Sequence, residues 1–126
     1  MPHALELDVE QRPWSLPSHV TDDLKTMVCI NLLHISPPTC TEALLMEACE
    51  RLPEDGLLII YGPFCRNGRQ TSASNAAFDV SLRQRNPLWG LRDLQWIDSL
   101  LGPLPMDTIG CHEMPANNNI LVLKRS

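Results

Sequence analysis

The sequence contains no apolar run that approaches the ~20 residues needed by a membrane-spanning helix. Its first residues, MPHALELDVEQ, show no basic start followed by an apolar stretch, so no signal peptide is expected. Metal-ligand spacing is missing too, because the four histidines and five cysteines are too scattered to form a recognisable zinc pattern. From these absences we expect no membrane partner, no bound metal and a cytoplasmic location.

Paired cysteine motifs are also missing. The five cysteines include no C-x-x-C pair, and their odd number without a signal peptide predicts reduced thiols. The ten lysines and arginines are scattered and the net charge is -5, so the sequence lacks the concentrated basic stripe of a nucleic-acid surface. We therefore expect no nucleic-acid partner.

The composition that remains is that of an ordinary globular protein. The chain has 126 residues, of which 44% are hydrophobic and 20% are charged. This length suits one domain rather than two, and this apolar content excludes a disordered chain. The sequence therefore predicts a single domain over residues 1–126.

The middle of the chain alternates apolar strands with a helix. Residues 26–33 (TMVCINLL) and 57–62 (LLIIYG) are nearly all apolar, which is typical of strands covered on both faces. Between them, Thr39 and Glu42 form a capping-box pattern, and apolar residues at helical spacing predict a helix over 39–52. A strand–helix–strand order predicts parallel pairing with a right-handed crossover.

Weaker patterns complete the order of elements. Residues 5–9 (LELDV) alternate apolar and acidic side chains and predict a short strand, whereas 72–85 and 92–101 predict helices. Residues 106–114 and 120–124 predict strands joined by a turn-rich loop. The fold class is therefore α/β, with a mostly parallel sheet that ends in a C-terminal antiparallel hairpin.

Five segments form a more specific pattern. They read CINLLHISP (29–37), LLIIYGPF (57–64), SNAAFDVSLR (74–83), NPLWGLRD (86–93) and EMPANNNILVLKR (113–125). Together they resemble the methyltransferase-like protein 26 family, a group of class I S-adenosylmethionine-dependent methyltransferase relatives. The resemblance covers essentially the whole chain, and it implies the C-terminal half of a methyltransferase (Rossmann-like) domain.

The resemblance also implies S-adenosylmethionine as cofactor, held in the family by a glycine-rich loop and an acidic residue. The six glycines of this chain form no G-x-G loop, although the cofactor needs the exposed N–H groups of such a tight turn. Asp8 matches the position that commonly contacts adenine, and residues 5–9 match the third strand of the family fold. We therefore expect cofactor binding that is weak or absent in this chain.

Ligands of parallel sheets bind beyond the carboxyl ends of the strands, and several motifs converge on that rim. Two residues at the end of the strand 26–33 are catalytic candidates. Asn31 could hold a methyl-accepting amine or hydroxyl by its amide, and His34 could act as a general base or as a hydrogen-bond donor to the substrate. The candidates for binding a small-molecule substrate are Tyr61, Pro63, Phe78, Trp89, Arg92, Asn117 and Asn118. Each has a structural alternative, because asparagines also form turns, aromatic residues fill cores, and Arg92 could help to cap a helix.

Three functions remain open. The chain is either a methyltransferase-family fragment that does not transfer methyl groups alone, a small-molecule methyltransferase completed by a second chain, or a non-catalytic binding module. Without the first strands of the family fold, residues 26–33 become an apolar edge strand that pairs readily with another chain. We therefore expect a homodimer through 26–33, unless residues 5–9 cover that edge.

Overall fold

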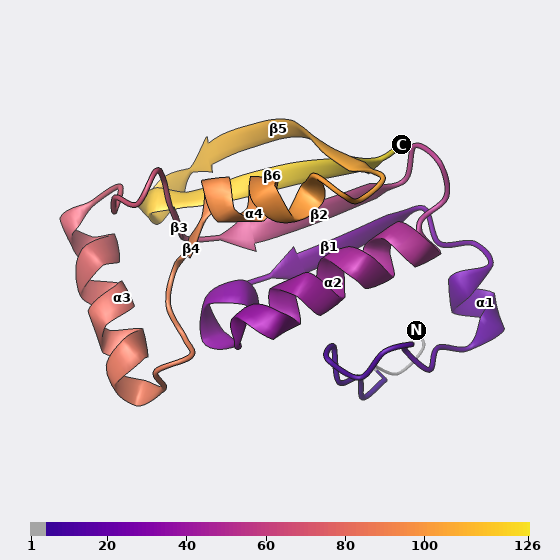
Figure 1. The fold of residues 1–126 in the computed structure, drawn as a ribbon, viewed down its shortest axis with the longest axis horizontal. Coiled ribbons are helices and arrows are strands. Elements are labelled where there is room, and N and C mark those ends of the chain that lie inside the picture. Colours follow the sequence, from indigo (N-terminus) through magenta and orange to yellow (C-terminus); the bar gives the residue numbers. More distant parts are fainter. Residues whose placement is uncertain (1–4) are drawn as a thin grey trace.

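The structure is a computed structural model, and it describes residues 5–126; His3, one of the four histidines, lies outside this range. A four-stranded sheet in the order β1–β2–β6–β5 forms its centre (Figure 1). The strands of this sheet are β1 (Thr26–Ile30), β2 (Leu57–Gly62), β5 (Met106–Met114) and β6 (Asn118–Arg125). A second, two-stranded sheet pairs β3 (Phe64–Cys65) with β4 (Arg92–Asp93). The helices are α1 (Ser18–Thr21), α2 (Pro38–Arg51), α3 (Ala73–Arg85) and α4 (Leu94–Leu101), with short 3-10 turns η1 (Leu33–Ile35) and η2 (Pro115–Asn117).

Strand directions confirm the predicted fold class. β1 pairs with β2 in parallel, whereas β6 is antiparallel to both of its neighbours, β2 and β5. β5 therefore runs in the same direction as β1 and β2, and the carboxyl ends of these three strands lie at one edge of the sheet (Figure 1). Within residues 5–126, no helix is long and apolar enough to cross a membrane.

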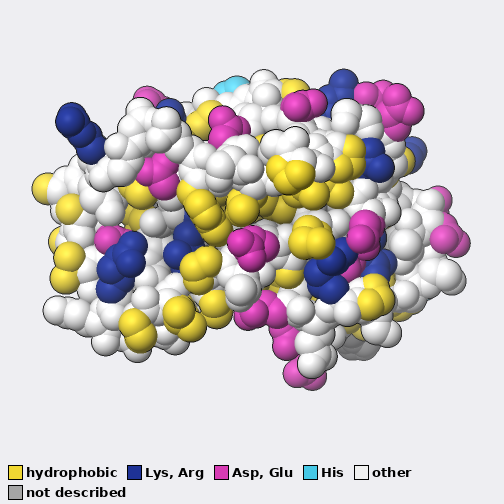
Figure 2. Space-filling model, in the orientation of Figure 1, with side chains coloured by type: hydrophobic (Ala, Val, Ile, Leu, Met, Phe, Trp, Pro, Cys, Tyr) yellow, Lys and Arg dark blue, Asp and Glu magenta, His cyan; other side chains and the backbone are white. Residues whose placement is uncertain are grey.

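Helices α2 and α4 lie on the same face of the sheet (Figure 1). On this face, the paired side chains of β1, β2 and β6 are buried. Together with residues of the two helices they form the core. They include Cys29, Leu58, Ile60, Leu121 and Leu123 from the sheet, Leu45 and Ala48 from α2, and Ile97 from α4. Apolar side chains follow the seam between α2 and α4, with charged groups of both signs around them (Figure 2).

The opposite face of the sheet is partly bare. Val28 and Ile30 of β1 are 61% and 63% exposed, because strand geometry turns them away from α2. β1 is also an edge strand, since its second edge pairs with no strand of the described residues. The expected homodimer through 26–33 stays a prediction.

The predicted strand over residues 5–9 is wrong. This segment forms no strand, and it lies beside α2, where Arg12 pairs with Glu47. The buried Trp14 packs into the core and donates its indole N–H to the carbonyl of Val9 at 2.9 Å. Alternation did not make this segment a strand although the edge of β1 is free among the described residues: residues 5–8 are exposed, and the segment that follows them is held by the contacts of Arg12 and Trp14.

Two other local predictions need correction. The Thr39–Glu42 capping box does not form: α2 begins after Pro37 without a side-chain cap, and Thr39 donates instead to Glu10 at 2.7 Å. The strand predicted to reach residue 33 ends at Ile30, because Asn31 adopts a left-handed φ of 53°. The predicted helices 39–52 and 72–85 are confirmed within about one residue at each end.

Candidate functional site

The carboxyl ends of β1 and β2 carry the two residues predicted to be catalytic. Asn31 follows β1 directly, and its N–H donates to the carbonyl of Tyr61 at 2.9 Å, which extends the ladder by one bond. Its left-handed backbone, which asparagine tolerates better than most residues, then turns the chain away from the sheet. The turn leads into η1 and places His34 beside the end of β2.

His34 is buried, with 6% of its surface exposed. Its ring packs edge-on against Phe78 of α3 at 5.6 Å between centroids, and its carbonyl accepts from Gly90 at 3.1 Å. Burial, followed by the charge of Arg92, lowers the pKa of His34 below its ordinary value. The imidazole is therefore neutral near pH 7 and can accept a proton.

Asn31 and His34 meet over Gly62, the last residue of β2. A Cβ atom placed on Gly62 would lie 3.6 Å from His34 Nδ1 and 3.8 Å from Asn31 Oδ1. The absent side chain of Gly62 thus leaves a gap about one methyl group wide between a neutral imidazole and an amide oxygen. In this arrangement the amide oxygen can orient an approaching hydroxyl or amine, and the imidazole can accept its proton.

Arg92 of β4 stabilises the turn that carries His34. Its guanidinium donates to three carbonyls: those of Leu33 at 3.2 Å, Ser36 at 2.7 Å and Leu88 at 2.7 Å. These bonds join the η1 turn to the 86–91 loop. The geometry therefore gives Arg92 a positioning role for His34.

The remaining rim candidates occupy different surroundings. Tyr61 precedes Gly62 in the strand, so its side chain points to the opposite face of the sheet. Pro63 is buried between β2 and β3, and Trp89 lies under the guanidinium of Arg85 at 5.4 Å. Only Phe78 among the predicted aromatic residues contacts His34 in the described structure.

Asn117 and Asn118 lie at the β5–β6 tip and line a separate hollow of about 160 Å³ with Arg66. The exposed Asn117 accepts a bond from Asn75 of α3 through its carbonyl at 3.1 Å, and Asn118 donates to Pro115 at 3.4 Å. This hollow does not include Asn31 or His34. The structure therefore separates Asn117 and Asn118 from Asn31 and His34.

Asp8 lies away from both positions. Its carboxylate is exposed and accepts a bond from the N–H of Glu10 at 3.0 Å. The residues that line the hollow around it all belong to the segment 6–15. No group of three or more His, Cys, Asp or Glu side chains within residues 5–126 is arranged to hold a metal ion.

Two polar residues at the rim did not stand out in the sequence. The buried Asn119 is paired with Gly62 across β2 and β6, and its Oδ1 accepts from Arg66 Nη2 at 3.3 Å. The available signal was weak: Asn119 occupies an inward position of a strand whose other inward positions are leucines. Arg66 gave no signal, because the bond joins residues 53 apart in sequence.

Comparisons with known proteins agree with this architecture. A family model described as "Protein of unknown function (DUF938)" matches residues 1–125. An O-methyltransferase family 2 protein from Planctomyces limnophilus, solved in complex with apigenin, superposes with a TM-score of 0.70 at 17% identity, over 81% of this chain and 30% of that chain. An O-methyltransferase family protein from Burkholderia thailandensis gives 0.68 at 17% identity, over 88% and 33%. A variant of LepI in complex with SAH and a substrate analogue gives 0.67 at 10% identity, over 81% and 26%.

At these identities the similarity shows the fold alone. The chain has the α/β fold of part of a methyltransferase, and it spans about 30% of the length of the first of these structures.

Proposed function

The chain belongs to the DUF938 family, a family of proteins of unknown function, and from this premise we propose that it forms the acceptor side of a class I S-adenosylmethionine-dependent methyltransferase. The five segments that include CINLLHISP and NPLWGLRD point more narrowly to the methyltransferase-like protein 26 group. In this proposal the chain does not transfer methyl groups by itself.

One observation carries the proposal: Asn31 and His34 meet over Gly62 at the carboxyl ends of two adjacent parallel strands. Methyl transfer needs an acceptor held in line with the methyl group, and a base where the acceptor must lose a proton. Asn31 would orient the acceptor by its amide. His34, kept neutral by burial, would accept the proton from the attacking hydroxyl or amine.

The residues of this chain do not fit the cofactor itself. The sequence offers no G-x-G turn for its carboxylate and ribose, and Asp8 lies in a hollow formed only by residues 6–15. We therefore assign no cofactor-binding role to the described residues. The groups that hold S-adenosylmethionine would belong to polypeptide outside this sequence, or to a second chain.

Calorimetric titration with S-adenosylmethionine tests the donor side. We expect a dissociation constant no tighter than about millimolar, which corresponds to ~4 kcal/mol. A micromolar constant for the isolated chain would overturn the proposal. A micromolar constant that appears only with a second polypeptide would favour the enzyme completed by another chain.

A phenol titration tests the acceptor side, since one similar structure was solved with apigenin. We expect millimolar phenol to shift the imidazole proton resonances of His34. The variant Gly62→Ala should abolish the shift, because its methyl group would fill the gap at ordinary contact distances of 3.6 Å and 3.8 Å without disturbing the fold.

Equal shifts in the wild type and in Gly62→Ala would contradict an acceptor site over Gly62. The non-catalytic binding module would be favoured by two results together. Gly62→Ala would abolish phenol binding, and the protein would not bind S-adenosylmethionine even when a second polypeptide is added.

A further inference from the structure

Arg66 begins a tight turn that directly follows β3. Its N–H and carbonyl each bond to the backbone of Arg69 at 2.9 Å, and Asn67 and Gly68 between them adopt left-handed φ angles of 52° and 74°. The carboxylate of Asp93, which also caps α4, accepts from the N–H of Gly68 at 2.6 Å. The backbone that carries Arg66 is therefore fixed to the start of a helix.

The Arg66 side chain is held by only one of its nitrogen atoms. Nη2 donates to Asn119 Oδ1 at 3.3 Å and reaches the sulfur of Cys111 at 3.5 Å. No acidic side chain within residues 5–126 lies within ion-pair distance of Arg66, and Nε and Nη1 have no acceptor there. The guanidinium thus has no ion-pair partner among the described residues, and several of its N–H donors are available to another group.

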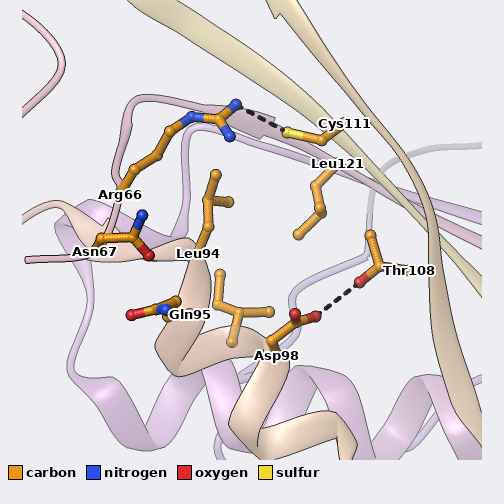
Figure 3. Close-up of a pocket in the computed structure, with 9 residues that line it drawn as sticks. Arg66, Asn67, Leu94, Gln95, Asp98, Thr108, Cys111 and Leu121 are labelled. Atoms are coloured by element: carbon orange, nitrogen blue, oxygen red, sulfur yellow. Dashed lines mark hydrogen bonds between the residues drawn. The ribbon is translucent and has the colours of Figure 1, made fainter.

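These donors lie at a hollow of about 220 Å³ between the turn, α4 and the β5–β6 hairpin (Figure 3). The side-chain amides of Asn67 and Gln95 add polar groups on the side of the hollow that lies opposite the β5–β6 hairpin (Figure 3). The apolar part of the lining consists of Leu94, Ile97 and Leu121. Asp98 lies at the other end, where its carboxylate accepts from Thr108 at 3.2 Å.

We propose that this hollow binds a small organic carboxylate, with the carboxylate on Arg66 and the apolar body against Leu94 and Leu121. A guanidinium matches a carboxylate in geometry as well as in charge, because its N–H groups form a planar fork. The apolar lining favours an organic anion over an inorganic one. Asp98 repels a carboxylate from the far end, so it fixes the direction in which the ligand enters.

The site is independent of methyl transfer. Its lining does not include Asn31, His34 or Gly62, and the side-chain hydrogen bonds of Arg66 go to Asn119 and Cys111 instead. A carboxylate can therefore bind at this hollow even if the acceptor site over Gly62 fails its test. Equally, the acceptor site can pass its test even if no carboxylate binds here.

Titration of the ¹⁵N-labelled chain with isocaproate tests the proposal. We expect millimolar isocaproate to shift the side-chain amide resonances of Asn67 and Gln95, and the neutral isocaproamide to shift them far less. Arg66→Gln should weaken isocaproate binding about tenfold or more, because the charge-assisted pair is lost. Arg66→Lys keeps the charge without the fork and should give an intermediate affinity.

Arg69→Gln is the matched control, since Arg69 belongs to the same turn, is exposed and does not line the hollow. It should bind isocaproate like the wild type, and the dispersion of each ¹⁵N spectrum verifies that the variant is folded. The proposal is overturned if isocaproate causes no shift at tens of millimolar, if isocaproamide or inorganic phosphate binds as well as isocaproate, or if Arg69→Gln weakens binding as much as Arg66→Gln.

Discussion

A buried charge cluster joins the N-terminal segment to α2, and its removal should cost measurable stability. Glu47 of α2 is fully buried, and its two carboxylate oxygens accept from Arg12 Nε at 3.0 Å and Arg51 Nε at 2.6 Å. Arg51 also donates to the carbonyl of Trp14, and Arg12 forms a second ion pair with Glu50 at 2.7 Å. Glu47 is thus the common partner of two arginines from different segments.

The variant Glu47→Gln keeps the size of the side chain and removes its charge. Breaking a buried ion pair by removing one partner costs about 3–5 kcal/mol, because the other charge is left uncompensated. The arginine side chains here remain 23% and 13% exposed, so water offsets part of that penalty. We therefore expect Glu47→Gln to lower the free energy of unfolding by about 3 kcal/mol.

Urea unfolding followed by circular dichroism measures this change, and Glu50→Gln is the matched control. Glu50 pairs with the same arginine, but its side chain is 61% exposed, so its removal should cost about 0.5 kcal/mol or less. Hydrogen exchange should also show faster exchange over residues 9–16 in Glu47→Gln. If the two variants are equally stable, the buried cluster does not hold the segment and the reasoning fails.

Three further predictions concern titration, thiol reactivity and association. Burial lowers the pKa of His34, so the unfolded chain binds more protons than the folded chain. The free energy of unfolding should therefore fall as pH decreases below about 6.5, and in His34→Gln this contribution to the pH dependence should vanish. Burial raises the pKa of Cys29 to about 11, so Ellman's reagent at pH 8 should label the exposed Cys111 at once and Cys29 only on unfolding; early labelling of both would contradict this. If the bare face of β1 forms a dimer, light scattering should give a dimer for the wild type and a monomer for Val28→Lys. Ile109→Lys, on β5 at the far edge of the sheet, is the control and should remain a dimer. A monomeric wild type would contradict the prediction.

Local patterns predicted most of the secondary structure. Continuous apolar runs predicted β2 and the start of β1, and helical spacing predicted α2, because these signals depend on neighbours within a few residues. The rim position of Asn31 and His34 also followed from the sequence, since parallel strands end at the same edge of a sheet. These inferences needed only the order of the elements.

The sequence by itself therefore determined the α/β class, the order of its elements and the edge at which its polar residues gather. Only the tertiary structure decided how that edge is divided. Asn31 and His34 lie on either side of the gap over Gly62, whereas Arg66, which bonds to Asn119, lines the separate hollow at the β5–β6 tip. Both depend on contacts between residues far apart in the chain and on which face of a strand each side chain occupies. Periodicity within one segment contains neither of these facts, because the partners are chosen by packing between segments.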